Sequence, residues 1–141
     1  MPDELYYQRQ IIKDVKKVCP QAFAMKMSHK FASGIPDLLV KTPKHPIVFI
    51  EVKKIEMLPA KGRIKVGTTP LQRKVMDDMM EAGIACQVWV VMEKSYDGTP
   101  GPFIVCVHPS AEEVQVFDYT IYQRPKAKTW PIGTMFAKTA V

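Results

Sequence analysis

Two short apolar segments that flank a proline-containing turn place the strongest constraint on how this chain can fold. The segments Asp37–Lys41 and Ile47–Lys53 have the length and the apolar side chains of β-strands. The segment Thr42–Pro46 between them contains two prolines, which favour a turn. The sequence therefore predicts that these two strands form a hairpin.

Strand and helix patterns continue on both sides of this hairpin. Thr69-Pro70-Leu71-Gln72 is a strong helix start, because threonine suits the N-cap, proline suits the first helical position, and glutamine at the third completes a capping box. Gly83 is a suitable residue to end this helix. The other expected elements are a first helix over Asp3–Val18, a strand over Ala22–Phe31, and strands over Cys86–Met92 and Phe103–Val107. The predicted order is α-β-β-β-α-β-β.

Three segments have less regular patterns. Ile55–Thr68 lacks clear periodicity and is expected to form a loop. Ser110–Phe117 fits both a short helix and a strand. Beyond Tyr122, prolines and lysines predict an irregular tail, although Trp130 and Phe136 indicate that it packs on something.

The size and composition of the chain predict one globular domain. A chain of 141 residues with 47% hydrophobic content can bury a single core. Its acidic, polar start lacks the features of a secretory signal, and no apolar run approaches the roughly 20 residues of a membrane-spanning helix. The three widely spaced cysteines fit reduced thiols. We therefore expect a cytoplasmic protein in which residues 1–122 form the domain and residues 123–141 are its basic C-terminal extension.

The positive charge of the chain favours a polyanionic partner. The formal net charge is +6, and lysines and arginines that neutralise phosphates release condensed counterions. Between Lys53 and Lys74 the only acid is Glu56. The residues expected to contact a phosphate backbone are Lys54, Lys61, Arg63, Lys65, Arg73 and Lys74. Solvated loops without a ligand are the simpler explanation of the same charges.

Two carboxylates and a lysine stand at positions that the hairpin would bring together. Alternate residues of a strand point to the same face, so Glu51 and Lys53 are neighbours, and hairpin pairing can place Asp37 beside Glu51. Two carboxylates are a common anchor for Mg²⁺, and a backbone carbonyl near Val52 could add a further oxygen ligand. Lys53 could orient or deprotonate a water molecule, or neutralise charge on the phosphorane. An ordinary surface ion pair between Glu51 and Lys53 is the alternative.

The ordered motifs resemble the signature of the VRR-NUC branch of the PD-(D/E)xK nucleases. The similar segments are Gly34-Ile35-Pro36-Asp37, Phe49-Ile50-Glu51-Val52-Lys53 and Thr69-Pro70-Leu71-Gln72. The resemblance implies an α/β fold of the restriction-endonuclease-like type, with an α-β-β-β-α-β core and a mixed central sheet flanked by helices. It also implies a Mg²⁺ ion, with Mn²⁺ as a possible substitute, held by Asp37 and Glu51, and Lys53 as the catalytic base or charge stabiliser.

The same resemblance assigns two further residues to the active site. Gln72 falls where the family places a glutamine that contacts the site, and Glu4 falls where the first helix usually contributes an acid. Both residues also have simpler explanations. A capping box accounts for Gln72, and the helix macrodipole favours an acid in the first turn.

The resemblance implies that the chain hydrolyses DNA phosphodiester bonds. Small members of the family are similar to Holliday-junction resolvases, so the leading hypothesis is a homodimeric endonuclease that is selective for branched DNA and uses no small-molecule cofactor. Two symmetrical nicks require two active sites, which is the physical reason to expect a dimer. The alternatives are a catalytically inactive nucleic-acid-binding module of the same fold, and an adaptor that binds protein through the tail around Trp130.

Overall fold

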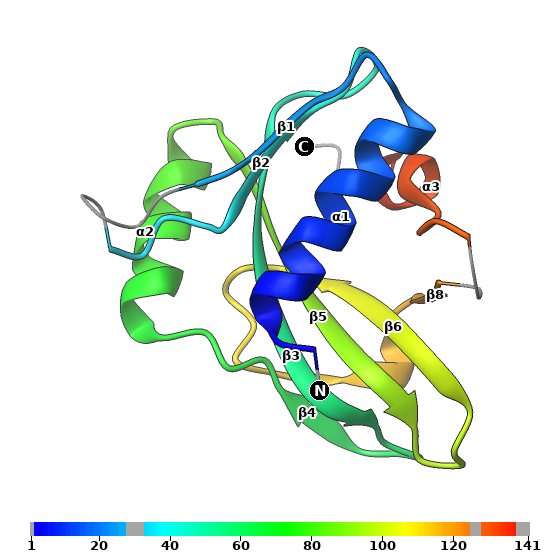
Figure 1. Ribbon diagram of the computed structural model, residues 1–141. Coiled ribbons are helices and arrows are strands. Elements are labelled where there is room, and N and C mark those ends of the chain that lie inside the picture. Colours follow the sequence, from blue (N-terminus) through cyan, green and yellow to red (C-terminus); the bar gives the residue numbers. More distant parts are fainter. Residues whose placement is uncertain (1, 28–32, 125–127, 138–141) are drawn as a thin grey trace.

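A six-stranded mixed sheet forms the centre of the molecule, with neighbouring strands in the order β1-β2-β3-β5-β6-β8 (Figure 1). The computed structural model describes residues 2–27, 33–124 and 128–137. The strands of this sheet are β1 (Phe23–Lys26), β2 (Leu38–Lys41), β3 (Val48–Leu58), β5 (Ala85–Ser95), β6 (Pro100–Val107) and β8 (Ile121–Gln123). A second, two-stranded sheet consists of β4 (Arg63–Lys65) and β7 (Glu113–Gln115).

The central hairpin forms as the sequence predicts. Strand β2 pairs antiparallel with β3, and Leu38 lies opposite Ile50. On its other side β2 pairs with β1, which is an outer strand of the sheet. Strand β1 ends at Lys26, before the predicted end of this strand, and residues 28–32 of the predicted range lie outside the described residues.

Strands β3 and β5 run parallel, and helix α2 (Pro70–Glu81) lies in the connection between them. Parallel neighbours need a crossover of this kind. The side chains of Thr69 and Gln72 form the predicted capping box at the start of α2. Because Glu51 lies opposite Val88 of β5, the strand that carries the predicted catalytic residues lies inside the sheet rather than at its edge.

Helices cover both faces of the sheet (Figure 1). Helix α1 (Glu4–Val18) and the short helix α3 (Ile132–Ala137) pack on one face, where their apolar side chains share a buried cluster with those of β2 and β3. Helix α2 and the β4–β7 sheet pack on the other face. The cluster buried there includes Ile64, Met76, Val88, Val90 and Val114.

The segment that was expected to be a loop, Ile55–Thr68, contains strand in two places. Strand β3 continues to Leu58, and its pairing with β5 extends to Leu58 opposite Ser95. Strand β4 then pairs with β7, with Ile64 opposite Val114. A long neighbouring strand and a distant partner stabilise backbone that has no strand periodicity of its own. The prediction of a loop was therefore wrong for residues 55–58 and 63–65 and holds for the residues between and after them.

The C-terminal part of the chain is also more ordered than its sequence predicts. Within the ambiguous range Ser110–Phe117, strand β7 forms and is followed by the 3₁₀ helix η1 (Val116–Asp118). The tail contributes α3 instead of remaining irregular. Buried Asp14 of α1 accepts hydrogen bonds from the Arg124 side chain and from the backbone N–H of Trp130, both at 2.9 Å. These long-range contacts hold the tail, which local patterns cannot show.

Candidate active site

The chain passes close to α2 just before it reaches Asp37. Gly34 has a φ of +86°, and a β-carbon there would lie 2.9 Å from Val75 Cγ2 and 3.2 Å from the Leu71 carbonyl oxygen. A glycine is therefore required both by backbone conformation and by space. After Gly34 the chain passes through buried Pro36 and reaches Asp37, immediately before β2.

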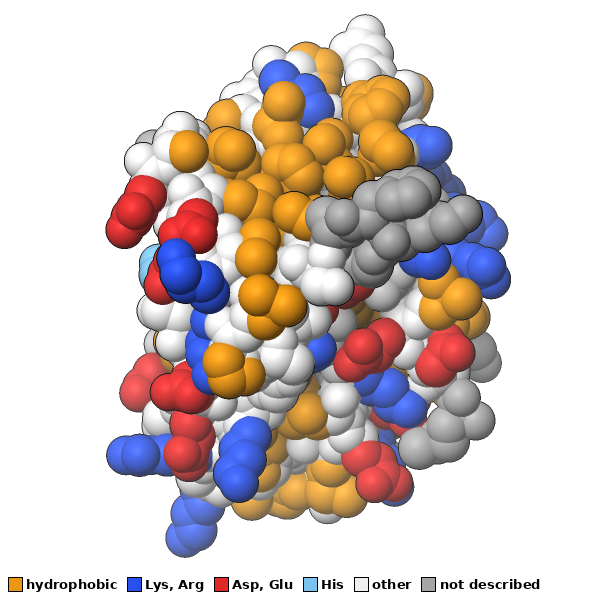
Figure 2. Space-filling view, turned by 90° about the vertical axis from the view of Figure 1, so that its left-hand side faces the viewer, with side chains coloured by type: hydrophobic (Ala, Val, Ile, Leu, Met, Phe, Trp, Pro, Cys, Tyr) orange, Lys and Arg blue, Asp and Glu red, His pale blue; other side chains and the backbone are white. Residues whose placement is uncertain are grey.

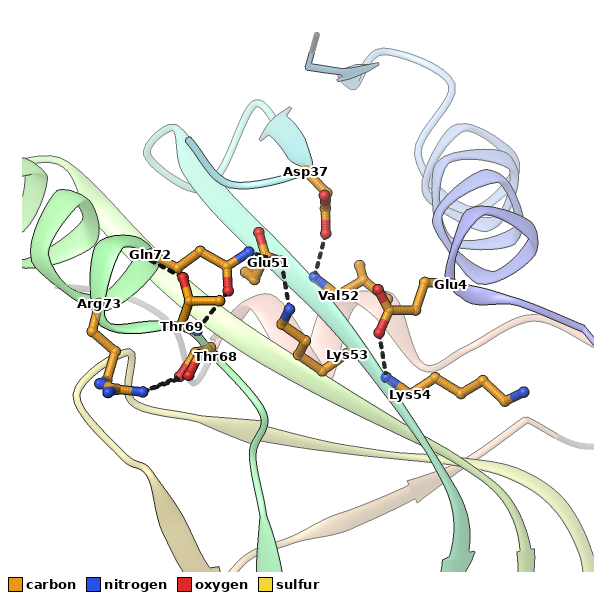
Figure 3. Close-up of polar contacts among 10 residues, drawn as sticks. All are labelled: Glu4, Asp37, Glu51, Val52, Lys53, Lys54, Thr68, Thr69, Gln72 and Arg73. Carbon is orange, nitrogen blue, oxygen red and sulfur yellow. Dashed lines mark hydrogen bonds and ion pairs between the residues drawn. The ribbon is translucent and has the colours of Figure 1, made fainter. Parts of the chain in front are cut away.

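Carboxylates occupy the edge of β3 that β2 leaves uncovered (Figure 3). The β2–β3 pairing stops at Leu38 opposite Ile50, so the next amides of β3 lack a strand partner on that side. The backbone N–H of Val52 donates to Asp37 Oδ2 at 2.9 Å, and that of Lys54 donates to Glu4 Oε2 at 3.1 Å. The site is therefore built where the antiparallel hairpin ends and only the parallel pairing with β5 continues.

Glu51 lies at the centre of the arrangement and is 2% exposed. Its Oε2 accepts a hydrogen bond from Gln72 Nε2 at 3.1 Å and lies 3.5 Å from Lys53 Nζ. Its other oxygen, Oε1, is buried and accepts no hydrogen bond from the described part of the chain. An unused buried acceptor is costly in a folded protein, so this atom has capacity for a ligand.

The surroundings of Glu51 favour the neutral form of its carboxyl group in the absence of a cation. The pKa of Glu51 is raised to about 8. Burial of the carboxyl group is the main cause, and the negative charge of Asp37 is the next. The positive charge of Lys53 acts in the opposite direction. A hydrogen bond with Asp37 and the charge of Glu4 make smaller contributions to the rise. The positive charge of Lys53 therefore does not offset the burial of Glu51 and the negative charges of the neighbouring carboxylates.

Gln72 combines the two roles that its sequence position allows. Its Oε1 accepts a hydrogen bond from the backbone N–H of Thr69 at 2.9 Å, which completes the capping box. Its Nε2 donates to Glu51. Because one amide makes both contacts, the start of α2 is linked directly to the carboxylate.

The carboxylate pair fits a hard divalent cation. A cation would neutralise the Glu51 carboxylate and would bind its Oε1, which accepts no hydrogen bond from the described residues. The N–H and C=O of one strand residue point to the same edge, so the Val52 carbonyl faces the side on which Asp37 lies. In the described ranges, no cluster of three His, Cys, Asp or Glu side chains could hold a metal by itself. The arrangement therefore suits Mg²⁺, which usually takes one or two carboxylates and completes its shell with water and substrate oxygens.

The six predicted phosphate contacts fall into two groups. Lys61, Arg63 and Lys65 are exposed on and beside β4. The other three cations, Lys54, Arg73 and Lys74, are paired within the chain.

These pairs have different surroundings. Lys54 lies 3.2 Å from Glu93, which also accepts from the Tyr7 hydroxyl at 3.3 Å. Arg73 contacts Glu112 at 2.9 Å and donates to the carbonyl of Thr68. The exposed Lys74 pairs with Asp78 one helical turn further along α2. Sequence reasoning missed Glu93 as the partner of Lys54, because only the register of β3 against β5 brings these two residues together.

Comparison with known proteins identifies the fold. No protein-family model and no curated protein sequence matches the chain. The structure is similar to that of Hjc, a Holliday junction resolvase from the archaeal hyperthermophile Archaeoglobus fulgidus, with a TM-score of 0.54 over 82% of this chain and 90% of that chain at 13% sequence identity. The chain has the restriction-endonuclease-like fold of that resolvase, so the predicted fold class is confirmed. None of the described helices is both long enough and apolar enough to span a membrane.

Proposed function

We propose that the protein is a Mg²⁺-dependent endodeoxyribonuclease, similar to the VRR-NUC branch of the PD-(D/E)xK nucleases, that hydrolyses phosphodiester bonds in branched DNA. The observation that carries the proposal is the buried Glu51 carboxylate, which contacts Lys53 and Gln72 and is close enough to Asp37 for the two charges to interact strongly. Buried charges that are not neutralised are costly to a fold. Two carboxylates that could hold a cation, with a lysine beside them, suit metal-assisted phosphodiester hydrolysis.

Each residue has a definite role in this mechanism. Asp37 and Glu51 would hold the Mg²⁺ ion, with the Val52 carbonyl as a further oxygen ligand. When bound, the ion polarises the scissile phosphate and lowers the pKa of water. Lys53 orients or deprotonates the attacking water, or neutralises the charge that develops on the phosphate oxygens.

Gln72 and Glu4 support this chemistry from neighbouring helices. The Gln72 amide fixes the orientation of Glu51 through its 3.1 Å hydrogen bond. Glu4 binds the Lys54 amide of β3, so it holds the start of α1 against the catalytic strand and adds negative charge near Glu51. Both are positioning residues in the proposal.

Branched DNA is the proposed substrate for two reasons. The similar solved structure is a Holliday junction resolvase. In addition, Lys61, Arg63 and Lys65 are exposed around β4, which packs through Ile64 on the same side of the sheet as α2 and Gln72. Cations at this place can contact the phosphates of a DNA arm that leads into the site. Cutting both strands symmetrically requires two active sites, so we propose a homodimer.

Cleavage of labelled DNA tests the proposal. Four-way junction, flap, fork and linear duplex substrates are incubated with Mg²⁺ and with Asp37→Ala, Glu51→Ala or Lys53→Ala protein. We expect each variant to lose at least about 100-fold in cleavage rate, a loss typical of removing a group that stabilises transition-state charge, and to retain junction binding. The parent should cut branched substrates faster than linear duplex.

The matched control is Glu56→Ala, which removes an exposed carboxylate from the same strand. It should cut as fast as the parent. If Glu51→Ala also cuts at the parental rate in Mg²⁺, the proposed mechanism is wrong. Junction binding without cleavage by the parent would instead support the catalytically inactive module.

A further inference from the structure

An apolar surface lies next to the carboxylates. Figure 2 shows a band of hydrophobic side chains that runs along this side of the molecule. Five large side chains from β1, α2 and the adjoining turns are exposed there. They are Phe23 (58%), Met25 (42%), Ile47 (46%), Leu71 (51%) and Ile84 (36%), and we call them the β1–α2 surface.

The strand register explains why this surface is continuous with the active site. Met25 lies opposite Leu39, and Leu39 lies opposite Phe49. Residues directly opposite one another share a face of the sheet, and Glu51 shares that face because it follows Phe49 by two positions. Helix α1 packs on the opposite face. The apolar surface and the Glu51 carboxylate are therefore neighbours on one face, next to α2.

The size of the surface matches that of the largest apolar patches on soluble proteins. A large apolar side chain has roughly 150–200 Å² of accessible surface, so the five exposed fractions leave on the order of 400 Å². The largest patch of a soluble protein is often functional, so this surface is a candidate interaction site. A standard protein interface takes about 800 Å² from each partner, of which this patch would supply about half. Half-exposed neighbours such as Leu39 and Val75 and the charged flanks can supply the rest.

Side chains of opposite charge flank the β1–α2 surface. On the α2 side lie the exposed acids Asp77, Asp78 and Glu81, with Lys74 paired to Asp78. On the β1 side lie the partly exposed Lys41, which is opposite Phe23, and the exposed Lys44 of the adjoining turn. A two-fold axis that runs along the apolar band would place the acidic flank of one copy against the lysine flank of the other. The surface is thus complementary to itself in both apolar character and charge.

We infer that the β1–α2 surface is the place where a second copy of this chain docks, with Phe23 and Ile47 in the apolar centre and the lysine and acidic flanks paired across the two-fold axis. The inference deepens the proposed function, which requires two active sites. Docking here would place both sets of carboxylates beside the interface, so the spacing of the two cuts would be set by the protein. A DNA backbone fits this surface poorly, because phosphates seek cations rather than an apolar centre.

Sedimentation analysis of the full chain without DNA tests the inference. We expect the parent to be a dimer at about micromolar concentration, and Phe23→Asp and Ile47→Asp each to weaken dimerisation at least about tenfold, since each buries a charge in the apolar centre. Both side chains are substantially exposed in the single chain, so the variants should keep the parental circular dichroism spectrum. The matched control is Phe117→Asp on η1, a 49% exposed aromatic outside the surface, which should remain a dimer.

Charge reversal tests the pairing of the flanks. Lys41→Glu with Lys44→Glu should weaken the dimer, and so should Asp77→Lys with Glu81→Lys. The chain that carries all four substitutions should recover dimerisation, because the two flanks are again complementary. Failure of this recovery would contradict the proposed orientation of the two copies.

Two results would overturn the inference: a parent that is monomeric at every concentration, or a dimer that Phe23→Asp leaves unchanged. Loss of junction binding by Phe23→Asp in a monomeric parent would assign the surface to DNA instead. The proposed function fails separately, through the cleavage assay. Glu51→Ala should stop cleavage and leave the dimer intact, so an active Glu51→Ala dimer would refute the chemistry alone.

Discussion

Glu51 should make the stability of the metal-free protein decrease as the pH rises. The ordinary pKa of the glutamate side chain is 4.5, and that of folded Glu51 is about 8. Below the lower value the carboxyl is protonated in both states. Between the two values the unfolded chain ionises while the folded chain keeps its proton, so the free energy of unfolding falls with rising pH. At about 1.4 kcal/mol for each unit of pKa difference, the loss approaches about 5 kcal/mol above pH 8.

Urea unfolding in the presence of a chelator measures this loss. Glu51→Gln keeps the size of the side chain and removes its ionisation, so its stability should exceed that of the parent by about 4–5 kcal/mol near pH 9 and match it closely near pH 4. Added Mg²⁺ should stabilise the parent at high pH and have little effect on Glu51→Gln, because the ion binds the ionised carboxylate of the folded state. Parallel stability curves for the two proteins in chelator would refute the reasoning.

Three further substitutions test contacts that hold the site or the C-terminal tail in place, each measured by urea unfolding. Gly34→Ala should destabilise the fold by about 2–3 kcal/mol, because its φ is +86° and the added methyl group meets α2, and it should also slow cleavage. Asp14→Ala should cost about 3 kcal/mol, because Arg124 loses a buried partner, and it should be partly compensated by Arg124→Met. Thr69→Ala should cost about 1 kcal/mol through loss of the N-cap, and a cost near zero would show that Gln72 alone holds the start of α2.

The parts of the fold that local chemistry determines could be predicted from the sequence. The hairpin follows from two apolar strands joined by a short turn, and its register brings Asp37 to the side of β3 as expected. The start of α2 follows from the capping box at Thr69. Gln72 illustrates the limit of such reasoning. Its capping role could be predicted from the sequence, whereas its hydrogen bond to Glu51 depends on how α2 packs on the sheet.

Features that depend on distant partners could not be predicted. Strand β3 is long because β5 pairs with it to Leu58, and β4 exists because β7 reaches it. The tail becomes ordered through buried Asp14, which is remote from it in sequence. Lys54 and Arg73 looked like free cations, but their acidic partners come from other strands and loops.

The sequence separation of the contacts at the site also affects when the site appears during folding. Asp37 and the Val52 amide are 15 residues apart, whereas the contacts of Gln72 with Glu51 and of Glu4 with Lys54 span 21 and 50 residues. Local pairings generally form before distant ones. We therefore expect a chain emerging from the ribosome to form its hairpin early and to gain the contacts of Gln72 and Glu4, which hold the two helices against the carboxylates, only later.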